Sequence, residues 1–249
     1  MYGLYISDIR YFTELRSWGG IDVKYGSGAF MKTSEDAKKL GELMERIGTF
    51  AGKKCKAVIT DMNTPLGSNI GNALEVKEAV ETLQGKVKGR FYDVCIELAT
   101  DMLEIAGKGT NNECRAMAEE AVSSGKALDV LRKTIRLQGG DERICDDVSL
   151  LPRPEFHYEV RATEDMDIVS FNTEELGMTS LLLGAGRTEK GDRIDPSAGI
   201  VMNCSPGDTL SEGDVIMTLY SSFCSDFSNA AVRALNAVEF RSIGVRSYT

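Results

Sequence analysis

Three runs within residues 22–76 decide the fold: DVKYGSGAFM at 22–31, TDMNTPLG at 60–67 and GNALEV at 71–76. An apolar run enters the glycine turn of the first, and another precedes the loop of the second, so we expect a strand before each loop. A helix is predicted to begin at Asn72. Strand, loop and helix in this order favour an α/β layer.

The rest of the chain predicts helices first and short strands later. Thr33 and Asp36 form a capping-box pattern, and the apolar residues after it recur at helical spacing: Ala37, Leu40, Leu43, Met44, Ile47 and Ala51. That pattern predicts one buried helical face. Further helices are expected at 92–106, from 110, at 126–138 and 172–183, strands at 156–160 and 200–202, and an amphipathic terminal helix over 225–240.

Composition excludes several classes of protein. The chain has 249 residues and a formal net charge of −9, with a sequence pI near 4.9. This acidity disfavours nucleic acid and anionic membranes as partners. No apolar run approaches the length that spans a bilayer.

The six cysteines indicate a reducing compartment. No two of them form a C-x-x-C pair, which argues against a zinc or thioredoxin-type site. The sequence begins without a recognisable secretion signal, so we expect reduced thiols and a cytoplasmic location.

Two glycine-rich loops do not predict a nucleotide site. The loops at 26–31 and 184–189 begin like G-x-G-x-x-G but lack the last glycine. Gly186 and Gly191 have P-loop spacing, but Asp192 stands where that motif needs lysine. Backbone turns are the expected role of both loops.

The three opening runs resemble the middle of the pyrimidine-nucleoside and thymidine phosphorylases. The similarity continues at Gly139 to Asp141, Leu151-Pro152, Leu183 to Thr188 and Asp192 to Asp195. It covers about residues 22–222, and several separated motifs agree in order and spacing. The resemblance is therefore specific.

The resemblance implies the fold and its domains. We expect a partial mixed-sheet α/β domain at 21–152, followed by a smaller α/β hammerhead-like C-terminal domain at 155–240. Residues 1–20 do not match the family and are interpreted as a divergent leader. The complete enzymes also have an all-α domain and form dimers, so a homodimer is expected.

The resemblance also implies a potassium ion. Glu75 lies in the first turn of a helix that Asn72 would cap, where the helix dipole favours a carboxylate. In the family the matching glutamate helps to bind potassium together with backbone carbonyls, here those of Leu66 and Asn69. A hard cation binds several oxygens, and a loop beside a helix start can direct them to one point. The family completes the shell with residues beside its phosphate loop, so a partial site is expected.

The implied reaction is nucleoside salvage by glycosyl transfer. The complete enzymes split a pyrimidine nucleoside with phosphate as co-substrate, giving free base and pentose 1-phosphate. This requires a positioned phosphate and stabilisation of an oxocarbenium-like sugar. The family's phosphate loop resembles KHSTGG, and no such run occurs in this sequence. The chain is interpreted as the C-terminal portion of such an enzyme, inactive or nearly so alone, and no catalytic residue is assigned.

Other readings remain open. The chain could be a non-catalytic homologue that serves as an interaction or dimerisation module. It could also represent a related phosphorylase acting on nucleoside monophosphates or another base.

Isolated charged residues give weaker indications. Lys24 is either solvated or a source of positive charge near a phosphate, and His157, the only histidine, is expected to be packed or on the surface rather than a general acid. We interpret the remaining candidates as residues of solvated turns: Asp61, Glu189, Asp192, Asp195, Arg187, Lys190 and Arg193.

Overall fold

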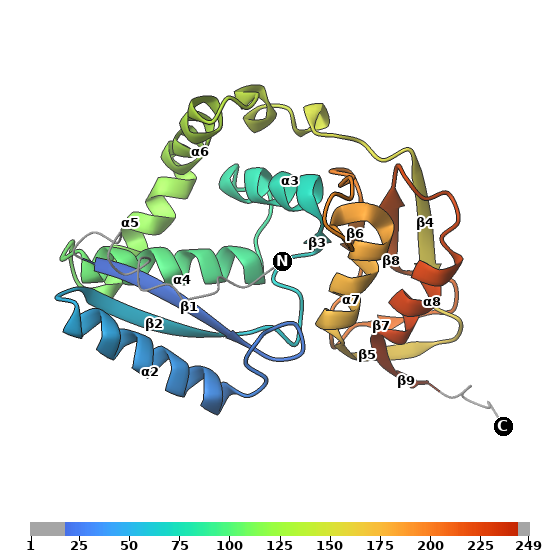
Figure 1. Ribbon diagram of the computed structural model, residues 1–249, viewed down its shortest axis with the longest axis horizontal. Coiled ribbons are helices and arrows are strands. Elements are labelled where there is room, and N and C mark those ends of the chain that lie inside the picture. The colour runs from blue at the N-terminus through green and yellow to red at the C-terminus, as the bar shows by residue number, and fades with distance from the viewer. Residues whose placement is uncertain (1–17, 244–249) are drawn as a thin grey trace. The chain divides into compact units, whose positions relative to one another are not determined.

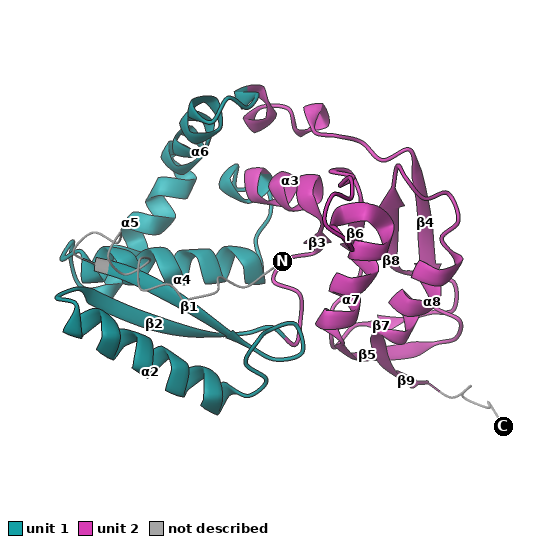
Figure 2. Ribbon diagram, viewed as in Figure 1, with its two compact units in different colours: residues 1–62, 81–142 teal, residues 63–80, 143–249 magenta. Residues whose placement is uncertain are grey.

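The computed structural model describes residues 18–243 (Figure 1). The chain divides into two compact units (Figure 2). The described parts of unit 1 are residues 18–62 and 81–142, and those of unit 2 are residues 63–80 and 143–243. None of the described helices is long and apolar enough to cross a membrane.

Unit 1 is built on a β-α-β element. Strands β1 (Trp18–Tyr25) and β2 (Lys54–Asp61) are parallel and in register from Trp18 opposite Lys54 to Tyr25 opposite Asp61. Helix α2 (Ser34–Phe50) connects them, as a crossover between parallel strands requires. The predicted N-cap is confirmed, because Thr33 Oγ1 accepts a hydrogen bond from the Asp36 amide at 3.2 Å.

The buried face of α2 differs from the predicted one. Leu43 and Ile47 are 48% and 41% exposed, so the prediction that they are buried is wrong. Ala37 and Met44 are buried as predicted, and the rest of the buried face consists of Gly41 and Gly48. A Cβ on Gly41 would lie 2.9 Å from Ala57 Cβ. The helix therefore packs so close to β2 that periodicity of large apolar residues alone misplaces its face.

Three further helices, near the predicted bounds, belong to the described part of unit 1. They are α4 (Arg90–Ile105), α5 (Asn111–Ser123) and α6 (Lys126–Leu137). The second capping box is also confirmed, since Glu113 accepts from the amide and hydroxyl of Thr110, both at 2.8 Å. Helix α4 packs against both strands and α5 packs against α4 and α6.

Unit 2 contains two antiparallel sheets. The larger has the order β3-β6-β8-β4 and the smaller has the order β7-β5-β9. The strands of the larger sheet are β3 (Asn69–Ile70), β6 (Gly199–Met202), β8 (Val215–Ser221) and β4 (Phe156–Arg161). Those of the smaller are β7 (Thr209–Leu210), β5 (Met166–Phe171) and β9 (Val238–Ser242). The predicted mixed α/β class is confirmed.

Helices α7 (Thr173–Ser180) and α8 (Ser228–Asn236) contribute to the core of unit 2. A single π turn, Leu181–Ala185, follows α7, and two 3₁₀ turns, Glu142–Cys145 and Val148–Leu150, precede β4. The predicted terminal helix over 225–240 is partly wrong, because the chain leaves α8 and forms β9. Strand β9 pairs with β5, a contact far away in the sequence that local periodicity cannot report.

Helix α3 (Asn72–Leu83) begins in unit 2 and ends in unit 1. Residues 63–80 belong to unit 2, although they lie inside the 21–152 range expected for the first domain. Residues 63–80 belong to unit 2 because β3, which lies within this range, pairs with β6. Of the expected leader, residues 1–17 lie outside the described residues, and residues 18–20 begin β1.

Candidate cation site at the start of helix α3

The register of β3 turns one backbone carbonyl away from the sheet. Asn69 lies opposite Val201 on β6, and the amide of Met202 donates to Ser68 O at 2.7 Å. In an antiparallel pair, hydrogen-bonded and non-hydrogen-bonded positions alternate. Because Ser68 occupies a bonded position, Asn69 directs its N–H and C=O away from β6.

A buried carboxylate holds this loop. Glu78 of α3 is 6% exposed, and its two oxygens accept from the amides of Ser68 at 2.8 Å and Asn69 at 3.2 Å. A Cβ on Gly67 would lie 2.2 Å from Glu78 Oε2, so a larger residue there would displace the carboxylate. Bonds to a carboxylate are stronger than neutral ones. Glu78 thus fixes the loop that carries Leu66 and Asn69. Glu78 was not predicted as a site residue, although the recurrence of Glu75 and Glu78 at i and i+3 places both on one face of the helix.

The start of α3 is docked by close backbone approach. Gly71 has φ of +140°, and a Cβ there would lie 2.4 Å from Ala198 O. The amide of Ala73 donates to Pro196 O and Asn72 Nδ2 donates to Ala185 O, each at 3.0 Å. The expectation that Asn72 caps the helix is wrong, because the Glu75 amide donates to Gly71 O at 2.8 Å, which makes Asn72 the first helical residue.

Glu75 places a carboxyl group in a partly buried position. Its Oε1 accepts from the amide of Gly71 at 3.2 Å. Burial raises the pKa of the Glu75 carboxyl; the hydrogen bond from Gly71 opposes the shift and the Glu78 carboxylate adds to it. A cation beside Glu75 would relieve the same unfavourable electrostatics.

Leu66, Asn69 and Glu75 thus lie on one loop and the helix turn that follows it, all within unit 2. Leu66 and Asn69 are half-buried. Within residues 18–243, no group of three or more His, Cys, Asp or Glu side chains is placed to hold a metal ion. A cation in unit 2 would depend on backbone oxygens, the donor set of hard ions rather than of zinc or copper.

Asp195 supports the segment against which α3 docks. It is 2% exposed; Oδ1 accepts from the amide of Ser197 at 2.9 Å and from its hydroxyl at 2.6 Å, and Oδ2 accepts from the amide of Ser222 at 2.5 Å. The prediction of a solvated turn residue is wrong here. The Asp-Pro-Ser run was the available signal, since aspartate bonds readily to a backbone amide two residues on.

Lys24 is engaged within the sheet of unit 1. Its Nζ lies 2.8 Å from Asp22 Oδ2 and donates to Thr60 Oγ1 at 3.1 Å. Thr60 in turn donates to Asp22 Oδ1 at 2.5 Å. The lysine is therefore neither a freely solvated residue nor an unopposed positive charge, but part of a link between the ends of β1 and β2.

Asp61 ends β2, half-buried, with Arg90 Nη1 3.4 Å from its Oδ2, so the prediction of a solvated turn residue is wrong for it. The remaining candidates close turns or lie on the surface. Asp192 accepts from the amides of Thr188 and Glu189 and from the Thr188 hydroxyl, which lowers the pKa of its carboxyl. His157 is exposed on β4, with its ring centroid 6.3 Å from that of Tyr220. Neither residue is placed as a general acid by any contact in the described part of the chain.

Known proteins match both units. The family model described as "Glycosyl transferase family, a/b domain" matches residues 20–128, and the model described as "Pyrimidine nucleoside phosphorylase C-terminal domain" matches residues 168–241. The chain is 43% identical over 202 residues to a pyrimidine-nucleoside phosphorylase of Bacillus subtilis (strain 168). It is 42% identical over 202 residues to one of Staphylococcus aureus (strain USA300).

Each of these alignments covers 81% of the chain and 47% of the relative. The chain thus spans about half the length of the curated relatives it matches. Two models of one enzyme family match in consecutive order, and the identity is well above the level at which only a fold is shared. The chain belongs to the pyrimidine-nucleoside phosphorylase family, a family of glycosyltransferases.

Proposed function

We propose that this chain serves phosphorolysis of pyrimidine nucleosides, in which phosphate displaces the base and leaves a pentose 1-phosphate. The observation that carries the proposal is the identity of 43% to a pyrimidine-nucleoside phosphorylase over 202 residues that include both units. Uridine and thymidine are the substrates to test first.

A partial potassium site belongs to the proposal. The carbonyls of Leu66 and Asn69 and the carboxylate of Glu75 would hold the ion. Three observations favour it: the Asn69 carbonyl points away from β6, Glu78 fixes the loop, and Glu75 is partly buried with a raised pKa. Bound there, potassium would neutralise Glu75 and order the loop before α3.

Potassium binding is testable without activity. In the purified chain, potassium chloride should raise the melting temperature of unit 2 above the value in choline chloride of equal ionic strength. Glu75→Gln should remove most of that difference, because it removes the charged ligand. An equal rise in wild type and Glu75→Gln would contradict the site.

Catalysis by the chain alone is not expected. The family's phosphate loop resembles KHSTGG, and no such run occurs in the sequence. The carboxylates and the lysine weighed as candidates are engaged in local bonds. We propose that the 249-residue chain has no activity, or very weak activity, without further protein.

The test is phosphorolysis of uridine and thymidine by the purified chain with saturating phosphate and potassium. Circular dichroism on the same sample verifies folding. The expected result is a folded spectrum without release of uracil or thymine. Robust phosphate-dependent release of base would contradict the inactivity, while leaving the reaction class supported.

A second candidate function is a non-catalytic interaction module. It is favoured by unit 2, whose core draws side chains from strands of both sheets and from both helices. Size-exclusion chromatography with an intact phosphorylase tests it: a stable complex supports the module, and separate elution argues against it. We propose that the chain works in the cytoplasm, whether it serves the enzyme or acts as a module, because its six free cysteines would stay reduced there.

A further inference from the structure

Strand β4 lies at the edge of the larger sheet of unit 2. It pairs with β8 on one side, and no strand of the described chain pairs with its other side (Figure 1). Phe156 and Tyr158 on this strand are 36% and 48% exposed. An uncovered edge strand can pair with another chain.

The alternation of hydrogen bonds shows which backbone groups face outward. The amide of Ala162 donates to Asp214 O, so Ala162 directs its backbone towards the β8 side. The register shifts between Val160 and Arg161, and the extra residue lies on β8, which leaves the alternation along β4 intact. Even-numbered residues of β4 therefore bond to β8, whereas odd-numbered residues, His157 among them, direct N–H and C=O outward.

The pairing of β8 with β6 gives the same answer independently. The amide of Asn203 donates to Ile216 O, so the even-numbered residues of β8 bond towards β6. The odd-numbered ones, such as Leu219, then bond towards β4. Leu219 lies opposite Tyr158, which confirms that the even-numbered residues of β4 are the ones bonded to β8.

The sequence of β4 complements itself in one antiparallel register. In a two-fold pair centred on Tyr158, Phe156 lies opposite the partner's Val160, and His157 lies opposite the partner's Glu159. Glu155, one residue before the strand, comes beside the partner's Arg161, which within its own chain also contacts Glu159 and Gly213 O. Apolar residues thus meet apolar residues, and each acidic side chain meets a side chain that can donate or carry positive charge.

Other registers are less favourable. A centre at Glu159 sets that carboxylate against its own copy, and a centre at His157 sets Glu155 against Glu159. Like charges directly opposite destabilise a strand pair. A centre at Val160 carries the pairing past Arg161, where the strand ends.

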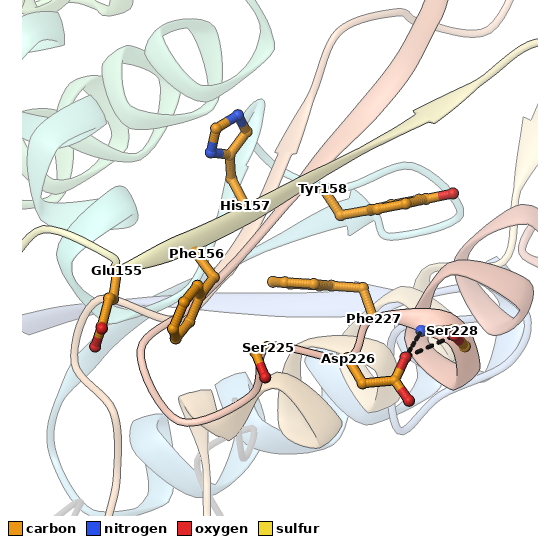
Figure 3. A pocket seen from close by; sticks show the side chains of 8 residues that line it. All are labelled: Glu155, Phe156, His157, Tyr158, Ser225, Asp226, Phe227 and Ser228. Carbon is orange, nitrogen blue, oxygen red and sulfur yellow. Dashed lines mark hydrogen bonds between the residues drawn. The ribbon is translucent and has the colours of Figure 1, made fainter.

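An aromatic hollow lies on one face of the same edge. It has a volume of about 450 Å³ and is lined by residues 155–158 and 225–228 (Figure 3). The Tyr158 ring is stacked on Phe227, with centroids 6.0 Å apart and planes 16° from parallel. Phe156 and Tyr158 share one face of β4, so a second β4 in this register adds its own pair of rings to that face.

We propose that the outer edge of β4 is a self-association surface, on which a second copy of this chain pairs its own β4 antiparallel about Tyr158. The inference depends on the geometry and charges of β4 and not on the proposed reaction. Paired this way, the larger sheet continues from one copy into the other, and the outward N–H and C=O groups of His157 and Glu159 in both strands are satisfied. The Glu155 amide stays bonded to Ser222 Oγ of its own chain.

A charge-exchange experiment tests the register in the full chain. Sedimentation velocity over a concentration series should show a reversible dimer. Arg161→Glu should weaken it at least about fivefold in dissociation constant, because two like-charge contacts with Glu155 replace two attractive ones. Combining Glu155→Arg with Arg161→Glu should restore dimerisation. Lys38→Glu, an exposed change on α2 with the same shift in net charge as Arg161→Glu, should have no effect.

A second variant tests the backbone. Glu159→Pro removes an N–H that points away from β8, so the ladder within the sheet stays intact while the dimer is lost. Far-UV circular dichroism verifies folding. A wild type that is monomeric at every concentration overturns the proposal, and so does a dimer unchanged by Arg161→Glu and Glu159→Pro. Failure of the double variant to restore the dimer overturns the register.

Discussion

The two units differ most in how they bury apolar side chains. The core cluster of unit 2 includes fully buried residues from both sheets and from α7 and α8, among them Met166, Leu176 and Leu219. Among the described residues of unit 1, the buried cluster consists of Ile21, Val23, Ala37 and Met44, with partly buried apolar side chains packed against it. Large apolar side chains of unit 1 lie exposed, with Phe30 at 83% and Phe50 at 96%.

The difference shows that clear sequence motifs and dense packing occur in different parts of this chain. Unit 1 carries the best-marked helix starts and most of the opening runs, yet the described residues form a parallel sheet of two strands there. Parallel sheets are ordinarily buried on both faces, and two strands bury little by themselves. Unit 2 has short strands with weak local signals, and long-range pairing closes its core. We expect unit 2 to be the more stable unit.

The largest expected effect is the loss of the centre of unit 2. Leu219 is 0% exposed on β8, between β6 and β4. Leu219→Ala should lower the free energy of unfolding of unit 2 by about 2–5 kcal/mol, because the cavity left behind adds to the lost burial. Peptide-resolved hydrogen exchange in urea measures each unit separately. Leu43→Ala, at a site 48% exposed on α2, is the contrast and should cost well under half as much; equal losses would refute the ranking.

A smaller effect is expected where backbone approaches backbone. Gly199 has φ of +157°, and a Cβ there would lie 2.1 Å from Ile70 O. Gly199→Ala should destabilise unit 2 by about 1–3 kcal/mol by forcing β3 away from β6. It should also reduce the stabilisation by potassium. Gly177→Ala is the matched control: its Cβ meets nothing within 4 Å on helix α7, so helix propensity should make it neutral or stabilising.

In unit 1, the buried side chain of Asp101 makes an ionic contact with Lys56, and its removal tests the comparison of stability between the two units. Asp101 on α4 is 3% exposed, and Lys56 Nζ on β2 lies 2.5 Å from its Oδ1 and 3.1 Å from Glu104 Oε2. Asp101→Ala should cost about 1–2 kcal/mol, since Lys56 is partly exposed and can be hydrated. The change should speed hydrogen exchange in β1, β2 and α4 only. Glu104→Ala, at the exposed end of the network, should cost less, and a larger loss there would show that Asp101 is not the anchor.

The smallest effect concerns Glu75 and pH. Because burial raises the pKa of Glu75 in the folded state, folding favours its protonated form. That contribution is complete below the unfolded pKa, near 4.5, and is lost as pH rises through the higher folded value. Without potassium, Glu75→Gln should therefore stabilise unit 2 at pH 7 by less than about 1 kcal/mol.

The control is the dependence on pH and on potassium of the stability difference between Glu75→Gln and wild type. The advantage of Glu75→Gln over wild type should shrink as the pH is lowered through the raised pKa of Glu75 and should vanish below about 4.5, where both side chains are neutral. Potassium should reduce it at pH 7 by stabilising the wild type. Thermal melts across this range measure it, and an advantage that is independent of pH would mean that the carboxylate charge is not its cause.

Much of the local structure could be predicted from the sequence. Thr33 and Thr110 mark two helix starts correctly because a capping side chain acts within three residues. Strand β9 and the small-residue face of α2 could not be predicted, because the first depends on pairing with β5 and the second on the distance between a helix and a sheet. At the candidate site, Glu75 was predicted from the family resemblance. Glu78 and Asp195 could not be predicted, because their roles depend on buried hydrogen bonds that only the structure shows.

The sequence by itself determined the family, the α/β class and most helix bounds, since motif order and capping chemistry are local. Only the tertiary structure decided that residues 63–80 join unit 2, that Glu78 clamps the loop before α3, and that β4 presents an open edge. Each of these follows from strand pairing and close backbone approach between segments far apart in the chain. Such contacts are fixed by the packing of the whole unit rather than by any short run of residues.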